Sequence, residues 1–219
     1  MRHSARTYPT RLTILLLTIA LPMCGQQPLH QIADRVDAHY NHLSSLKLDY
    51  TERYSGMGQT RSETGILLLK KPGRMRWNYA SPAGKVFVLD GKYAWFYTPG
   101  DAQAQRISAK QLDDLRSPLR FLLGHLKIEK ELTQITLQTN GNTAIITGVP
   151  KGMEDRIHAM TLTCQTDTGV LTGLKIEELD GSTTEFAFTG LHENVPINDA
   201  DFQFLAPPGV TVIEGMPPA

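Results

Sequence analysis

The sequence predicts a mainly β protein with a few helices, an α+β fold built on an antiparallel sheet of about eleven strands. Short β-prone runs follow one another from Leu46 onward and are separated by four turn pairs. These pairs are Ser55-Gly56, Asp90-Gly91, Asn140-Gly141 and Asp180-Gly181. Such pairs are typical of tight hairpins, so many local hairpins imply an antiparallel meander and exclude a parallel sheet. The 41% hydrophobic content supports a packed core in one domain.

The first residues read as a targeting segment that precedes this domain. Three arginines come before an apolar run at 12–21, and this order is typical of a secretory signal peptide. The run is too short to span a bilayer, which takes roughly 20 helical residues. We therefore expect a signal peptide at 1–24 and a single domain at 25–219. Cys24 lies where a bacterial lipoprotein signal would place it, although Met23 precedes it instead of a small residue. Removal and acylation of Cys24 both remain open.

An amphipathic helix is predicted to open the mature domain. Its apolar positions recur at helical spacing: Leu29, Ile32, Ala33, Val36, Tyr40 and Leu43. Two more short helices are expected to interrupt the sheet between residues 108 and 124. Ser108 with Gln111 has the spacing of a capping box, and Ser117 before Pro118 is typical of a helix start. The second of these helices is rich in leucine and ends at Gly124.

The strands carry more apolar surface than a sheet with one solvated face requires. Met75, Trp77 and Tyr79 alternate with polar residues, so that strand has one apolar face. The runs at 66–69, 86–89 and 93–97 are apolar on both faces. Something must cover the second face. A sandwich or barrel with a filled core would do so, and so would a curved sheet around an apolar cavity closed by the helices. The pattern alone does not choose between them.

No catalytic or metal motif accompanies this sheet. The chain has no Gly-x-Ser-x-Gly elbow, no phosphate loop and no His-Glu-x-x-His. His39 and His42 could share a helix face, but no third ligand is indicated. Cys164 is expected to be a small buried residue on a strand. Because 22 basic residues balance 22 acidic ones, nucleic acid is not expected as a partner.

One ordered set of motifs resembles a known family. The segment 65–99 reads GILLLKKPGRMRWNYASPAGKVFVLDGKYAWFYTP. It is followed in order by Gln105, Ser117-Pro118-Leu119, Pro150-Lys151, Phe202-Gln203-Phe204 and the run PPGVTV at 207–212. Together these resemble the periplasmic outer-membrane lipoprotein carrier family, LolA, over nearly all of the mature chain. The resemblance implies a curved, unclosed antiparallel β-barrel with a helical lid over an apolar concave face.

The resemblance also implies roles for individual residues. The lipid-binding cavity is expected to be lined by Leu67, Leu69, Met75, Trp77, Tyr79, Phe87, Trp95 and Tyr97. The lid is expected to present Ile32, Val36, Leu119, Phe121, Leu122 and Leu123. The family usually has an arginine before the turn proline, which holds the lid shut through backbone carbonyls. Lys71 stands there in this chain, and lysine lacks the five-donor fork of arginine.

The function implied by the resemblance is transport without catalysis. A monomeric periplasmic carrier would shield the acyl chains of lipoproteins and need no cofactor or metal. Its partners would be acylated lipoproteins, an inner-membrane ATP-binding cassette complex as donor and an outer-membrane lipoprotein receptor as acceptor. The alternative is a membrane-anchored receptor or envelope-stress sensor on the same fold, acylated at Cys24. A lipid enzyme is disfavoured because no pair of nucleophile and base can be named.

Overall fold

The computed structural model describes residues 29–114 and 127–215. The helices are α1 (Leu29–His42), α2 (Ala109–Asp114), α3 (Ile128–Glu131) and the 3-10 turn η2 (Asp199–Phe202). The strands are β1 (Ser45–Gly56), β2 (Gln59–Lys70), β3 (Arg74–Ser81), β4 (Val86–Leu89), β5 (Tyr93–Tyr97), β6 (Gln103–Ser108), β7 (Leu132–Asn140), β8 (Thr143–Pro150), β9 (Ile157–Gln165), β10 (Leu171–Glu178), β11 (Thr183–Glu193) and β12 (Thr211–Glu214).

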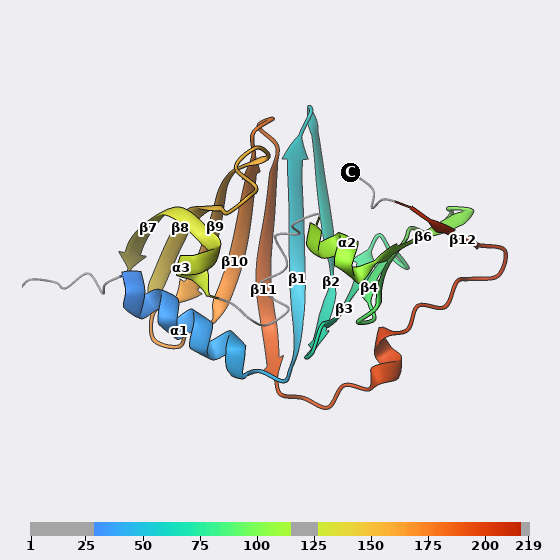
Figure 1. Ribbon diagram of the computed structural model, residues 1–219, viewed down its shortest axis with the longest axis horizontal. Coiled ribbons are helices and arrows are strands. Elements are labelled where there is room, and N and C mark those ends of the chain that lie inside the picture. The colour runs from blue at the N-terminus through green and yellow to red at the C-terminus, as the bar shows by residue number, and fades with distance from the viewer. Residues whose placement is uncertain (1–28, 115–126, 216–219) are drawn as a thin grey trace, which may run out of the picture.

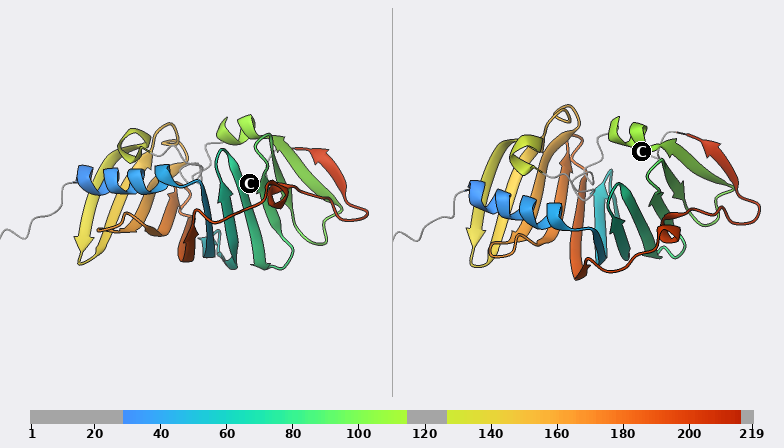
Figure 2. Two further views of the ribbon diagram at one scale, coloured as in Figure 1. Left: turned by 90° about the horizontal axis from the view of Figure 1, so that it is seen from below. Right: turned by 60° about the horizontal axis from the view of Figure 1, so that its bottom comes forward.

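These strands form one curved, unclosed sheet (Figures 1 and 2). Within the described residues the sheet has twelve strands in the order β12-β6-β5-β4-β3-β2-β1-β11-β10-β9-β8-β7, so β12 and β7 are its two edges. The predicted antiparallel meander is confirmed for the hairpin strands. It is wrong for β12, which pairs with β6 in parallel. No hairpin connects these two strands, because β12 returns from the far end of the chain, and turn signals could not reveal the pairing.

Hairpins occur at or next to all four predicted turn pairs, but the first turn is shifted by two residues and the third by one, because Asn140 still pairs with Thr143 and the turn residues are Gly141 and Asn142. Ser55 and Gly56 lie inside β1, and the turn is made by Met57 and Gly58. Their φ angles are 49° and 73°, so both central residues adopt the left-handed conformation that a type I′ hairpin needs. Methionine is an unusual residue there, which is why the sequence pattern pointed two residues upstream.

The three α-helices lie on one face of the sheet, which we call the inner face. Figures 1 and 2 show α1 crossing the half formed by β7 to β11, with α3 beside it and α2 over the other half. The predicted apolar stripe of α1 points inward, since Ile32, Ala33 and Val36 are fully buried against the sheet. The capping box at α2 is present. The Ser108 amide donates to Gln111 Oε1 at 3.1 Å, and the Lys110 amide donates to the Ser108 hydroxyl.

The C-terminal segment covers part of the opposite, outer face. After β11 the chain runs through η2 to β12, and Arg76 Nη1 donates to the carbonyl oxygens of Asp201 at 3.2 Å and Gln203 at 3.1 Å. The Phe204 ring stacks on Trp95 at 5.4 Å between centroids. On β5, the second apolar face that the sequence left unexplained is therefore covered by the chain's own C-terminal segment, without closure of the sheet.

Two further features bear on the sequence-based expectations. Cys164 is a buried free cysteine on β9, as expected for a small residue of a strand. Within the described residues, no helix combines the length and the apolar character needed to cross a membrane.

Candidate functional site

The inner face carries two rows of apolar side chains that run across neighbouring strands. The strand register aligns Leu48, Leu67, Trp77, Phe87 and Phe96 in one row. It aligns Leu46, Leu69, Met75, Leu89 and Ala94 in the next. Because directly paired residues point to the same side of a sheet, each row is continuous from β1 to β5. The sequence-predicted residues Leu67, Leu69, Met75, Trp77 and Phe87 therefore meet on one face.

Aromatic rings extend this face toward β11. Tyr50 packs edge-on against Trp77 with centroids 4.5 Å apart, and Trp77 lies 5.5 Å from Phe186. Phe186 stacks on Phe188 at 6.1 Å. Sequence reasoning missed Tyr50 and these two phenylalanines. Their alternation at spacing two, as in Phe186 and Phe188 of β11, was the signal that could have found them.

The prediction that Trp95 and Tyr97 line the concave face is wrong. Their register partners across β4 are Val88 and Val86, which lie on the outer face. Both rings instead contact Phe204, at 5.4 Å from Trp95 and 6.2 Å from Tyr97. Trp95 Nε1 also donates to Asp90 Oδ2 at 2.8 Å. Phe96, which lies between them in β5, takes the inner position.

The two halves of the inner face differ in how they are covered. Under α1 the sheet is filled by buried aliphatic side chains such as Leu162 and Leu174, and the partly buried apolar residues of β7 and β11 in the described ranges, Ile135, Leu137 and Leu191, are aliphatic. On β3, β4 and β5, Tyr79, Phe87 and Phe96 are only partly buried, although they pack against the same core. Phe87 and Phe96 face each other at 4.8 Å. On the inner face as described, the partly exposed aromatic rings that an added ligand could cover therefore lie on the β3–β5 half.

The helix α1 is tied down along its length. Arg35 Nη1 donates to the Thr166 carbonyl, and the Leu171 amide donates to Tyr40 Oη at 3.0 Å. The Asp37 carboxylate accepts the Ile128 amide at 3.0 Å, which fixes the start of α3. The backbone of α1 at Arg35 passes close to Gly169, where a Cβ would lie 2.7 Å from the Arg35 carbonyl. These contacts bind α1 to the sheet and to α3.

Lys71 reaches the C-terminal end of α1. Its Nζ donates to the carbonyl oxygens of Tyr40 at 2.7 Å and Asn41 at 3.1 Å. The last carbonyls of a helix have no partner within the helix, so a cation there satisfies them and interacts favourably with the helix dipole. Burial lowers the pKa of the Lys71 ammonium. The side chain therefore links the β2–β3 turn to the C-terminal end of α1.

Other predicted lid residues lie outside the described part of the chain. Leu119, Phe121, Leu122 and Leu123 belong to 115–126, which the structure does not describe, and Cys24 with the signal peptide belongs to 1–28. Ile32 and Val36 are the two predicted lid residues that can be placed, and both are buried on the side of α1 that packs against the sheet.

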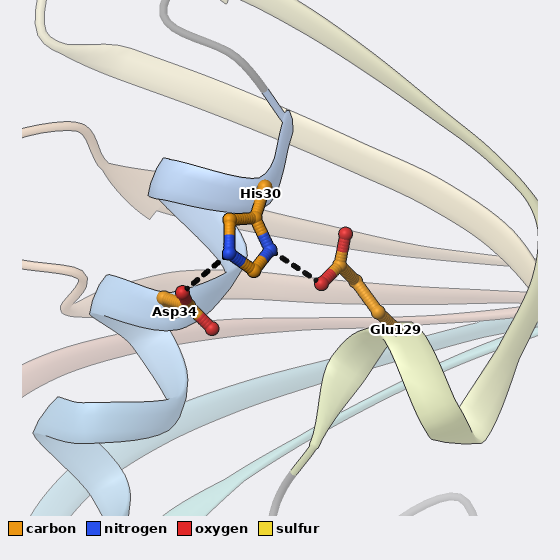
Figure 3. Close-up of side chains that lie close together, drawn as sticks. All are labelled: His30, Asp34 and Glu129. Carbon is orange, nitrogen blue, oxygen red and sulfur yellow. Dashed lines mark hydrogen bonds and ion pairs between the residues drawn. The ribbon is translucent and has the colours of Figure 1, made fainter.

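Figure 3 shows the one group of side chains among residues 29–114 and 127–215 whose ligand atoms gather as a metal site would. His30 Nδ1 lies 2.8 Å from Glu129 Oε2, and His30 Nε2 lies 3.0 Å from Asp34 Oδ2. Each carboxylate meets a different ring nitrogen, so the imidazole bridges them and the three do not converge on one point. The hydrogen bond with Glu129, followed by the charges of Asp34 and Glu129, raises the pKa of His30. The group links α1 to α3.

The two histidines singled out in α1 take separate partners. His39 Nε2 lies 2.9 Å from Glu193 Oε1, while His42 Nδ1 lies 2.6 Å from the Ala38 carbonyl oxygen. His39 is largely buried, because β11 brings Glu193 against it.

The amino-acid sequence matches a known protein family over most of its length. Residues 41–205 match the family described as outer membrane lipoprotein carrier protein LolA. The chain is 29% identical over 182 residues to the outer-membrane lipoprotein carrier protein of Sodalis glossinidius (strain morsitans), which covers 82% of this chain and 86% of that protein. It is 28% identical over 191 residues to the protein of that name from Azotobacter vinelandii (strain DJ), covering 86% and 87%.

A solved structure shares the fold. The crystal structure of an uncharacterized conserved protein from Thermus thermophilus matches with a TM-score of 0.55 at 11% identity, over 85% of this chain and 98% of that one. At this identity the likeness concerns the fold alone. The family match covers most of the chain and agrees with the unclosed curved sheet beneath a helix. This chain belongs to the outer membrane lipoprotein carrier protein LolA family.

Proposed function

We propose that this protein is a carrier that shields the acyl chains of lipoproteins on its inner face and moves them through the periplasm from the inner to the outer membrane. The observation that carries the proposal is the pair of continuous apolar rows from β1 to β5, with half-exposed Phe87 and Phe96, in a chain of this family. Binding and release need no chemical step, and we propose no catalysis.

The physical need for such a face follows from the cost of exposing hydrocarbon to water. Each CH₂ group contributes about 0.8 kcal/mol, so one chain of about 16 carbons faces a barrier on the order of 10 kcal/mol when it leaves a membrane. Apolar side chains can offset most of that cost if they remain partly uncovered in the empty protein. Tyr79, Phe87 and Phe96 meet this condition better than the residues under α1.

Because the two halves of the sheet differ in how far their apolar side chains are covered, we assign them different roles. The β7–β11 half is filled and tied to α1 through Arg35, Asp37 and Tyr40, so it serves as the rigid frame. The acyl chains would lie on the β2–β5 half. Lys71 stands between the two, at the end of α1, and we propose that it limits how far that end can separate from the sheet.

A donor complex of the ATP-binding cassette type in the inner membrane and a receptor in the outer membrane would load and unload the protein, which would act as a monomer. Removal of residues 1–24 on export would leave it free to move between them. The family membership and the basic and apolar order of residues 2–21 support this assignment.

Substitution on the inner face tests the carrier function. We expect Phe87→Gln to reduce the amount of acylated protein or fluorescent fatty acid bound at least several-fold, because a polar amide would face the chain. The matched control is Tyr97→Gln, which changes a half-buried ring on the outer face of the neighbouring strand. If Phe87→Gln keeps full binding while remaining folded, or if the unmodified protein binds no acyl chain, the carrier proposal fails.

The alternative, a membrane-anchored receptor or envelope-stress sensor, differs at Cys24. Acylation there would hold the protein on a membrane, whereas removal with the signal peptide would free it. Intact mass of the mature protein separates the two, because a triacylated cysteine adds most of a kilodalton by chain-length arithmetic. A mature chain that retains a lipid-modified Cys24 would support the anchored receptor or sensor and contradict the shuttle.

A further inference from the structure

The inner face changes character along β1 and β2. Next to the apolar rows comes a row formed by Tyr50, Gly65 and Tyr79, which the register aligns across three strands. The following row on the same face brings two carboxylates together, since Glu52 of β1 pairs directly with Glu63 of β2. Like charges directly opposite each other in a sheet are destabilising, so this pair requires an explanation.

Cations balance one of the two carboxylates. Glu63 is only 3% exposed, and Lys85 Nζ donates to both of its oxygens, at 2.8 and 2.7 Å. Lys85 also stands over the Tyr79 ring at 4.3 Å, and Arg61 Nε lies 3.2 Å from Glu63. Glu63 and Lys85 therefore form a buried, geometrically satisfied ion pair.

Glu52 is left without such a partner. It is half-buried, and no residue in the described ranges donates a hydrogen bond to its carboxylate. Burial raises its pKa and the neighbouring charge of Glu63 adds to the effect, while the more distant charges of Lys85 and Arg61 oppose it. A carboxylate in this position has unused acceptor capacity directed over the inner face.

The Tyr50 hydroxyl, in the neighbouring row, is a second and independent observation that points to a ligand group on this part of the inner face. The residue is 3% exposed, yet its hydroxyl makes no hydrogen bond of normal geometry with the part of the chain that the structure describes. The Tyr79 hydroxyl is near enough to interact with it but leaves its hydrogen-bonding capacity incompletely used. Its ring lies edge-on to Tyr79 at 5.7 Å. Gly65 allows this placement, since a Cβ there would lie 2.8 Å from Tyr50 Oη and 2.1 Å from the Asn78 carbonyl oxygen. Buried hydroxyls normally have a partner, so an unpaired one marks a place where a ligand group fits.

We propose that these two adjacent rows, with Tyr50, Tyr79, Glu52 and Glu63, form a polar subsite for the head of the bound amphiphile, and that the subsite selects an acylated peptide over an anionic phospholipid. The inference rests on the proposed function, because the acyl chains must lie on the adjoining apolar rows. Amide and hydroxyl groups of the peptide end donate hydrogen bonds to Glu52 and Tyr50. The phosphodiester of an anionic phospholipid donates none and carries the same charge as Glu52, so it is repelled there whatever its head alcohol can donate.

Selectivity of this kind has a physical purpose. The acyl chains of lipoproteins and phospholipids offer nearly the same apolar surface, so an apolar face alone cannot separate them. Discrimination needs a group that is repelled or left unpaired by the wrong ligand. The cations in the row do not reverse this preference. Lys85 is bonded to both oxygens of Glu63, and Arg61 shares that carboxylate.

The test compares two ligands with the same chains. Mature protein is titrated with an S-(dipalmitoylglyceryl)cysteinyl peptide of serine and glycine, and separately with dipalmitoyl phosphatidylglycerol, each displacing a fluorescent fatty acid. We expect the unmodified protein to prefer the lipopeptide by about tenfold or more. Glu52→Gln removes the charge and keeps the shape, so the preference should fall at least about threefold, mainly through tighter phosphatidylglycerol binding.

Further variants separate this subsite from general effects. Tyr50→Phe should weaken lipopeptide binding several-fold and change phosphatidylglycerol binding little. Glu185→Gln removes an exposed carboxylate from the outer face of β11 and should change neither. Equal binding of both lipids by the unmodified protein, or a preference that Glu52→Gln leaves unchanged, would overturn the selectivity while leaving the carrier function intact. Failure to bind either lipid would overturn both.

Discussion

Replacing Lys71 by methionine tests how the C-terminal end of α1 is held. The ammonium donates two hydrogen bonds to carbonyl oxygens at the helix end, the one to Tyr40 partly buried at 2.7 Å and the one to Asn41 exposed at 3.1 Å. Methionine fills a similar volume but offers no donor. The two carbonyls would then depend on water.

The magnitude follows from the two environments. A partly buried hydrogen bond from a charged donor contributes about 1.5 kcal/mol, and the exposed one about 0.5 kcal/mol. Burial lowers the pKa of Lys71, so part of this gain offsets the desolvation of the ammonium. We expect Lys71→Met to lower the free energy of unfolding by about 1 to 2 kcal/mol, which is about 3 to 6 °C in Tm for a domain of this size.

The assay combines urea unfolding with amide hydrogen exchange. Faster exchange should be confined to the last turn of α1, because Arg35 and Asp37 hold the earlier turns independently. Lys71→Arg should retain most of the stability, and Lys47→Met on the outward side of β1 serves as the control. A loss below about 0.3 kcal/mol with unchanged exchange would refute the idea that this side chain holds the helix end.

Three further predictions follow from the described geometry. Gly65→Ala should destabilise the protein by about 3 kcal/mol or more in urea unfolding, since the added Cβ would meet the Asn78 carbonyl oxygen at 2.1 Å; a loss below about 1 kcal/mol would contradict the close approach. Burial raises the pKa of the Cys164 thiol to about 11, so about one molecule in a thousand carries the thiolate at pH 8. Maleimide labelling should be slow until urea unfolds the chain, and fast labelling of the folded protein would be inconsistent with this burial. Glu129 raises the pKa of His30 above its usual 6.5, so the charged link between α1 and α3 is complete below pH 6.5 and is lost as the pH rises through the folded-state value; an NMR titration midpoint below 6.5 would exclude this link.

The side chains that a strand directs to the inner face could be predicted where the opposite side of that strand is polar. Met75 and Trp77 alternate with Arg74 and Arg76, so the pattern along β3 identified the buried side before any contact was known. Prediction failed on β5, where residues 93–97 are apolar on both sides. Phe96 points inward and Trp95 outward because of the register with β4, and a run without alternation carries no information about register.

The proposed head subsite could not be found from the sequence. Glu52 and Glu63 are 11 positions apart and look like ordinary exposed charges of a hairpin. They become a directly paired couple because the turn lies at Met57 and Gly58 and not two residues earlier. A shift of the turn would have changed the pairing of every residue along β1 and β2.

The sequence by itself determined the local structure: an amphipathic first helix, hairpin strands, a capped short helix and an excess of apolar strand faces. These features depend on spacing along the chain, which sequence records directly. Only the tertiary structure decided what covers each face and which charges meet. The C-terminal segment that covers Trp95 lies more than a hundred positions downstream, and Lys71 bonds to backbone carbonyls, which every residue type presents alike. Contacts of this kind depend on the path of the chain in space, and residue spacing does not encode that path locally.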